Sequence, residues 1–371
     1  MAFYKYDDND IATYFDTVNL SSSLTLTGFQ INGTDLARMY TPLGVNSNLS
    51  FPQYLGYTRG ITDSLNDIFE FNIIDKANTT CTYEKIPTTN GLYIKITGTG
   101  TFKYRQSCKG TLYLLGGGGG GGGQSNGNAG GGGGGGELVK ISFSSGVSEF
   151  TCTIGGGGGK GTNGLQGING GVTKLKLSNG DEITARGGGG GGRGFMAGVQ
   201  GGSVGGSGSA WPQSFDKNAV RSGNNTITII TDVVRSLNIG GHGSSNSDGG
   251  GGGGGGCGAE GQNADDNGDY NGGNGGAGLK LFEDDRFAFG GGGGGGGGYS
   301  MPRLGGRGTF GGGTGGQRTN QDGSYSNGSD ASNYGGGGGG APNINGEGGN
   351  GFKGIILMRI LDEDIVLVRP A

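Results

Sequence analysis

Leu112-Tyr113-Leu114-Leu115 runs directly into eight consecutive glycines, Gly116 to Gly123, and this stretch decides the fold. A short polar segment, 124–129, follows, and glycine resumes over 130–136. Further glycine runs occupy 155–159, 187–192, 249–256, 290–298 and 335–340. Glycine has no side chain to bury and loses more conformational freedom on folding than any other residue. An ordinary hydrophobic core therefore cannot organise this part of the chain.

Three structures are open to such runs: a disordered linker, a β-sheet solenoid and a bundle of polyglycine II helices. A flexible linker has no use for the apolar segments 138–143, 172–177 and 227–230, which lie among the runs. The polyglycine II helix is the left-handed conformation of polyproline II, and it makes no internal hydrogen bonds. Its backbone groups must pair with neighbouring chains, and only glycine lets those chains come close enough. We therefore expect the bundle.

The glycine content divides the chain into three parts. Nine of the 100 glycines precede residue 116, and none follows Gly354. We expect a β-rich N-terminal domain over 1–115, a glycine-rich polyglycine II bundle over 116–354, and C-terminal strands over 355–371. The C-terminal strands would close the core or pair with a neighbouring subunit. The expected fold class is thus mainly β plus polyglycine II: an N-terminal β domain followed by a left-handed helix bundle with short β-hairpins.

Alternating apolar residues predict the individual elements. Strands are expected at 23–31, 69–73, 92–97, 100–104, 112–115, 355–361 and 365–368, and a short helix at 34–40. Hairpins are expected over 140–154 and over 175–184, the second turning at Asn179-Gly180, a strong hairpin signal. Segments 207–240, 279–289 and 299–334 read as insertions between glycine runs.

Composition argues against several classes of partner. The net charge is −4, so no general electrostatic attraction draws the chain to nucleic acid. No stretch of about 18 apolar residues is present to span a membrane. The first ten residues lack the apolar core of a signal peptide. We expect a location on a virion surface or outside the cell, reached without a classical signal peptide.

Motifs that would indicate catalysis or a cofactor are incomplete. Gly159-Lys160-Gly161-Thr162 lacks the spacing of a phosphate-binding loop. The segment 263–274 begins like a calcium loop but ends on Asn274, where a glutamate is needed. His242 is the only histidine and reads as a turn residue. We therefore expect no enzyme activity, no cofactor and no metal.

The four cysteines stand at 81, 108, 152 and 257, in no metal-binding or redox motif. Cys81 and Cys108 could pair within the first domain, but the spacing favours free buried thiols.

Aromatic and arginine residues in the polar insertions are the candidate contact residues. Tyrosine offers a rigid surface that is both apolar and polar, which suits contact with carbohydrate or protein. The same side chains could instead pack the loops onto the bundle, with the arginines bonding turn carbonyls. The candidates are Trp211, Phe215, Tyr270, Tyr299, Arg303, Arg307, Tyr325 and Tyr334.

Several segments together resemble the glycine-rich domain proteins of viruses and bacteria. They are 96–102, 112–123, 147–159, 182–192 and 351–356, and the opening 29–36 resembles glycine-rich proteins of large double-stranded DNA viruses. The best-understood proteins of this kind are phage tail-fibre adhesins with polyglycine II sandwiches. This resemblance implies that loops between glycine helices contact a host receptor. The chain differs from the adhesins in its own N-terminal β domain and in insertions spread along its length.

Two functions follow as expectations. The first is a non-enzymatic structural protein of a virion surface or extracellular filament, which self-assembles through its β termini and rigid glycine bundles. Its partners would be further copies of the chain and other virion or fibre proteins. The second is a receptor-binding adhesin that recognises a host surface glycan or protein through loops 207–240, 262–274 and 299–334. An ice-binding protein is a weaker third, because the loops are too irregular for a flat repetitive face.

Overall fold

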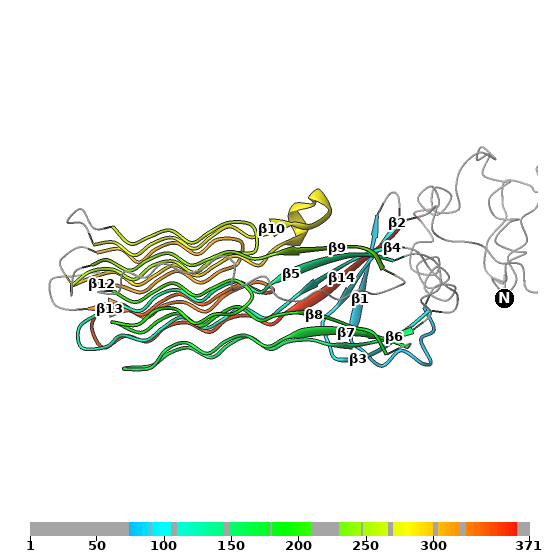
Figure 1. Cartoon of the computed structure of the whole chain (residues 1–371), viewed down its shortest axis with the longest axis horizontal. Coiled ribbons are helices and arrows are strands. Elements are labelled where there is room, and N and C mark those ends of the chain that lie inside the picture. The colour runs from blue at the N-terminus through cyan, green and yellow to red at the C-terminus, as the bar shows by residue number, and fades with distance from the viewer. Residues whose placement is uncertain are drawn as a thin grey trace, which may run out of the picture.

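The computed structural model describes residues 74–88, 91–104, 110–143, 149–178, 180–209, 230–245, 248–265, 270–299, 303–318 and 324–361. The described part is elongated, with two β-sheets at one end and long glycine segments running side by side from them to the other end (Figure 1). Several predictions lie outside the described residues: the strands at 23–31, 69–73 and 365–368, the helix at 34–40, and the positions of Cys108, Trp211 and Phe215.

The larger sheet has six strands, all antiparallel to their neighbours. In spatial order they are β1 (Tyr83–Thr88), β2 (Gly91–Ile96), β14 (Ile355–Leu361), β4 (Gly110–Leu115), β5 (Leu138–Phe143) and β9 (Ile230–Ser236). The last described strand therefore sits inside the sheet, between two strands from before residue 116. Ile356 and Met358 of β14 face one cluster of buried side chains, and Ile355 and Leu357 face another. Burial on both faces explains why β14 is an almost unbroken apolar run.

The smaller sheet supplies the other half of the main core. Its order is β3 (Gly100–Lys103), β6 (Glu149–Thr153), β7 (Thr173–Leu177) and β8 (Glu182–Ala185). Phe102 and Phe150 stack with ring centroids 5.3 Å apart and pack in one cluster with Ile94 and Ile356 of the larger sheet. The two sheets thus enclose one core.

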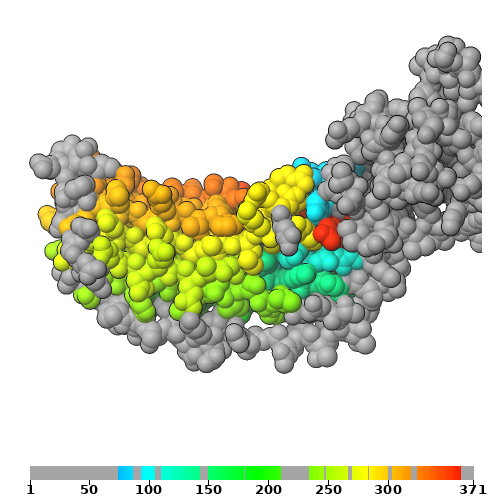
Figure 2. Space-filling model, turned by 90° about the horizontal axis from the view of Figure 1, so that it is seen from above, coloured from blue at the N-terminus to red at the C-terminus, as the bar shows by residue number. Residues whose placement is uncertain are grey.

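The far face of the larger sheet is covered by residues 279–289. This excursion comprises β10 (Leu279–Lys280), two 3-10 turns, η3 (Leu281–Glu283) and η4 (Asp285–Phe287), and β11 (Ala288–Phe289). Phe287 and Phe289 are buried against Leu357 of β14 in the second cluster. Figure 2 shows the excursion in yellow, standing beside the glycine segments.

The glycine runs are held together by their own backbones. Along 117–122 the N–H groups donate to three neighbouring segments in turn, and each neighbour recurs at every third residue. The three acceptor segments are 168–171, 349–352 and 131–134. This arrangement leaves no room for side chains, since a Cβ on Gly120 would lie 2.0 Å from the carbonyl oxygen of Gly159.

These observations correct the predicted fold class. Within the described ranges the only helices are the two three-residue 3-10 turns, so the left-handed polyglycine II helix bundle is not found. The regular elements are β-strands, and the glycine runs are extended segments that continue from them. The expected succession of a β domain and then a bundle is also wrong, because strands from 83–115, 138–143, 230–236 and 355–361 share one sheet. Pairing between segments far apart in sequence decides this arrangement of strands, and local composition does not predict such pairing.

Of the two predicted hairpins, one is confirmed. β7 and β8 pair as an antiparallel hairpin around Asn179-Gly180. The hairpin over 140–154 is wrong, because β5 pairs with β4 and β9 while β6 pairs with β3 and β7.

Candidate functional site: the distal tip

The end farthest from the two sheets gathers several of the predicted contact residues. It carries the two-residue pair β12 (Gln317–Arg318) and β13 (Tyr325–Ser326), which lies at the left end of Figure 1. We call Tyr270, Tyr299, Arg303, Arg318 and Tyr325 the tip cluster.

Two arginine–tyrosine pairs form the centre of the tip cluster. The guanidinium carbon of Arg303 lies 5.2 Å from the ring centroid of Tyr270, and that of Arg318 lies 5.0 Å from the ring centroid of Tyr299. Arg318 Nη1 also donates a hydrogen bond of 3.0 Å to the Tyr299 carbonyl. An antiparallel backbone bridge between Arg303 and Arg318 brings the two pairs together. Each cation–π contact contributes about 0.5–1 kcal/mol at an exposed site.

The tip cluster presents apolar surface to solvent on a fixed backbone. Tyr299 is 48% exposed and Tyr325 is 42% exposed. Asparagine side chains hold the segment that enters the tip: Asn271 Oδ1 accepts from the Leu304 amide at 3.0 Å, and Asn274 Oδ1 from the Arg307 amide at 2.7 Å. Asn271 and Asn274 are three residues apart, which matches the three-residue repeat of the glycine hydrogen bonds. Their side chains therefore take the place of backbone acceptors at the edge of the packed glycine segments.

The other predicted contact residues fall elsewhere. Arg307 lies on the segment that enters the tip and is exposed. Tyr334 packs edge-on against Phe289 and Phe352, with ring centroids 5.5 Å away in both cases. It therefore packs the glycine segments, which we call the shaft, beside the sheets. Sequence reasoning missed Arg318, which follows Gln317 without a flanking glycine. Its position before the polar segment 319–324 was the available signal.

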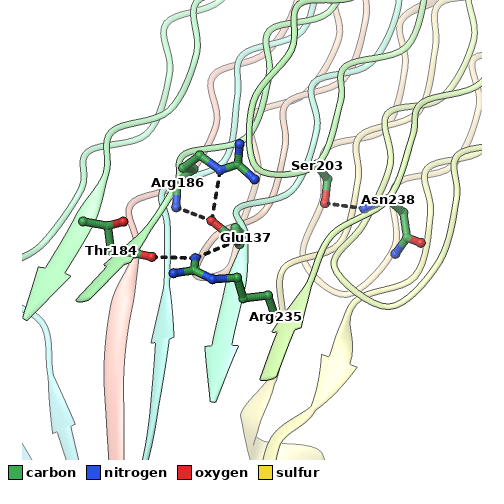
Figure 3. A network of polar contacts seen from close by, with 6 residues as sticks. All are labelled: Glu137, Thr184, Arg186, Ser203, Arg235 and Asn238. Carbon is green, nitrogen blue, oxygen red and sulfur yellow. Dashed lines mark hydrogen bonds and ion pairs between the residues drawn. The ribbon is translucent and has the colours of Figure 1, made fainter. Parts of the chain in front are cut away.

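A buried carboxylate joins the sheets to the glycine segments. Glu137 follows the run 130–136 and its side chain is fully buried. Glu137 Oε2 accepts from the Arg186 amide at 2.9 Å and from Arg186 Nε at 3.3 Å, and Oε1 accepts from Arg235 Nη1 at 3.0 Å (Figure 3). Arg235 Nη1 also donates to the Thr184 carbonyl at 3.0 Å. This network ties β5, β8 and β9 together where the chain leaves the sheets.

A groove lies beside the excursion, against the larger sheet. Its volume is about 580 Å³, and its lining includes Lys140, Val234, Lys280, Phe282 and Arg359. The Arg359 guanidinium lies 5.0 Å from the Phe282 ring centroid, and Lys280 pairs with Asp285. The groove opens next to β9, the strand that ends the larger sheet.

Neither a metal site nor a membrane-spanning helix is found in the described part. Its histidine, cysteine and acidic side chains form no group of three that could hold a metal ion. Among the same residues, no helix is both long enough and apolar enough to cross a bilayer.

Comparison with known proteins places most of the chain in one family. The family described as "Glycine-rich domain" matches residues 95–361. No curated protein matches the chain.

Proposed function

The chain belongs to the glycine-rich domain family, and we propose that it is a non-enzymatic structural protein of a virion surface or an extracellular filament. The observation that carries this proposal is the three-way hydrogen bonding of the glycine segments, which makes a long projection from backbone alone. Each buried hydrogen bond contributes about 0.5–1.5 kcal/mol net to stability. Because these bonds repeat along every run, the projection should resist bending and local opening. Such a body suits a spacer or a filament subunit.

The joint between copies is proposed to be the edge of β9. The larger sheet ends in β1 on one side and β9 on the other. β1 contains Pro87, which lacks an N–H and so weakens pairing at that edge. β9 contains no proline, runs for seven residues and exposes 48% of Val234. Among the described strands none pairs with the outer edge of β9. An unpaired edge recruits a further strand, and the adjoining groove offers space for side chains of a second copy.

Val234→Lys is expected to prevent self-association, because it places a strongly hydrated charge where the partner strand would pack. Electron microscopy and light scattering over a concentration series provide the measurement. The native chain should form filaments or defined oligomers, and the variant should stay monomeric. Leu165→Lys is the matched control, since Leu165 is 60% exposed on a glycine segment and should leave assembly intact. Native protein that remains monomeric at every concentration would contradict the proposed assembly.

A second function, a receptor-binding adhesin, is favoured by the tip cluster. Paired arginine and tyrosine side chains are typical of the residues that dominate binding energy at interfaces. Here they stand at the end of a stiff shaft, where a host surface glycan or protein could reach them. Arginine supplies donors for carboxylate or sulfate groups, and the tyrosine rings supply faces for sugar rings.

Tyr299→Ala is expected to weaken binding to host cells or to an immobilised glycan panel about tenfold or more, since truncating a central aromatic contact costs about 2 kcal/mol. Its loss also removes the ring on which Arg318 stacks. Flow cytometry and glycan-array titration measure the change. Ile168→Ala, at a side chain 62% exposed on a distant glycine segment, should bind as the native chain does. Equal binding by both variants would rule out the tip as the contact surface.

A further inference from the structure

Two cysteines from different sheets meet in the main core. Cys81 lies in the turn before β1, and Cys152 lies in β6 of the smaller sheet. Both side chains are buried in the cluster that the two sheets enclose. The neighbouring Cys152 thiol, together with burial, raises the pKa of Cys81 above its usual value. The neighbouring Cys81 thiol lowers the pKa of Cys152.

Gly100 is the reason that the two cysteines come so close. It pairs with Cys152 across β3 and β6. On its other side, a Cβ at Gly100 would lie 2.6 Å from the Cys81 backbone nitrogen and 2.8 Å from its Cα. The missing side chain therefore lets the Cys81 backbone lie directly on β3. Cys152 Sγ donates to the Gly100 carbonyl at 3.1 Å, and the Cys81 amide donates to the Thr101 carbonyl at 3.2 Å, so both cysteines are anchored to the same dipeptide.

We propose that Cys81 and Cys152 form a disulfide that joins the entry to β1 covalently to β6, and so locks the two sheets together. Disulfides require Cα atoms about 4.4–6.8 Å apart with side chains directed at each other. Both cysteines lie against Gly100 and share one buried cluster, which favours that approach. The bond would form in an oxidising environment, where disulfides persist. This inference does not depend on either proposed function.

The oxidant is a low-molecular-weight disulfide such as oxidised glutathione. The Cys152 thiolate attacks one sulfur of the oxidant, forms a mixed disulfide and releases one thiol. The Cys81 thiolate then attacks the Cys152 sulfur, the mixed disulfide breaks, and a second thiol leaves. Each cysteine loses one proton, and the oxidant takes up two electrons and two protons. Because both thiols are buried, the reaction should proceed during folding or through local opening.

Cys257 offers an internal comparison. Its thiol is buried in the second cluster, on the other face of the larger sheet, and contacts the Phe289 carbonyl at 3.6 Å. Burial raises the pKa of Cys257 to about 12. Cys257 should stay reduced under the same treatment, because the other two described cysteines lie together in the first cluster, on the opposite face of the larger sheet.

The test is to refold the full chain in reduced and oxidised glutathione, block free thiols by alkylation and map linked peptides by mass spectrometry. We expect a peptide that links Cys81 with Cys152, with Cys257 alkylated. Oxidation should raise the thermal midpoint by roughly 5 °C, as expected for closing a loop of this length in a chain of this size. Cys81→Ala and Cys152→Ala should each remove both the linked peptide and the shift, whereas Cys257→Ala should keep both.

A Cys81–Cys108 peptide, or free Cys81 and Cys152 in excess oxidant, would overturn the proposal. The peptide map of the native sequence decides the question even if a variant fails to fold.

Discussion

Gly133→Ala is expected to lower the free energy of unfolding by about 3 kcal/mol or more, the upper part of the range for overpacking a dense interior. Its Cβ would lie 2.2 Å from the carbonyl oxygen of Gly119 and 2.7 Å from the carbonyl carbon. Both are backbone atoms, so no side-chain rotation relieves the overlap. Gly133 also donates to the Gly338 carbonyl at 2.8 Å and accepts from the Gly293 amide at 2.9 Å. Separating one pair of segments would therefore disturb the bonds to two others.

The run 155–159 supplies a matched pair of variants. A Cβ on Gly158 would lie 2.0 Å from the Ile168 carbonyl oxygen, whereas a Cβ on Gly156 meets nothing within 4 Å. Gly158→Ala should thus destabilise the protein. Gly156→Ala should be neutral or should stabilise it by up to about 1 kcal/mol, because alanine restricts the unfolded chain. Denaturant unfolding followed by circular dichroism measures all three variants. Equal stability of the three would show that the glycine segments do not pack at the distances described.

Glu137→Gln is expected to lower the free energy of unfolding by about 3 kcal/mol, because it removes the only charge that balances Arg186 and Arg235 within the network of Figure 3. Removing one member of a buried ion pair costs about 3–5 kcal/mol. The lower end applies here, because the arginine side chains left behind are 34% and 23% exposed. The amide keeps the shape of the side chain and can accept only part of the hydrogen bonding. The loss of stability in this variant therefore reflects the missing charge more than a change in packing.

Glu182→Gln is the control, because the nitrogen–oxygen distance of its ion pair is the same as that of Glu137 with Arg235, whereas the burial of the glutamate differs. Lys174 Nζ lies 3.0 Å from Glu182 Oε1, as Arg235 Nη1 lies 3.0 Å from Glu137 Oε1. The Glu182 side chain is 39% exposed and that of Glu137 is 0% exposed. An exposed pair contributes about 0–1 kcal/mol, so Glu182→Gln should be nearly silent in the same unfolding assay. If both variants lost equal stability, burial of Glu137 would not be the cause.

The tip illustrates how far site prediction from sequence can reach. Tyrosine and arginine side chains in polar loops predict four contact residues that meet at one end: Tyr270, Tyr299, Arg303 and Tyr325. Tyr334 has the same kind of neighbours in sequence, yet it packs against Phe289 and Phe352. Only the path of the glycine segments decides which loops reach the tip and which lie beside the sheets.

The sequence by itself determined where glycine is indispensable and where strands form. The strands predicted at 92–97, 100–104, 112–115 and 355–361 are present, because alternating or continuous apolar residues state locally which positions must be buried. The glycine runs likewise predict, from sequence alone, that neighbouring backbones will pack too closely to leave space for a Cβ.

Tertiary structure alone decided which segments become neighbours. It placed β14 between β2 and β4, separated β5 from β6, brought Cys152 to Cys81, and paired Glu137 with two distant arginines. It also replaced the expected helix bundle with extended segments continuing from a shared sheet. The physical reason is that one glycine run offers the same donors and acceptors as any other. Partner choice therefore rests on the few side chains at the ends of the runs and on the closure of the apolar core between the sheets.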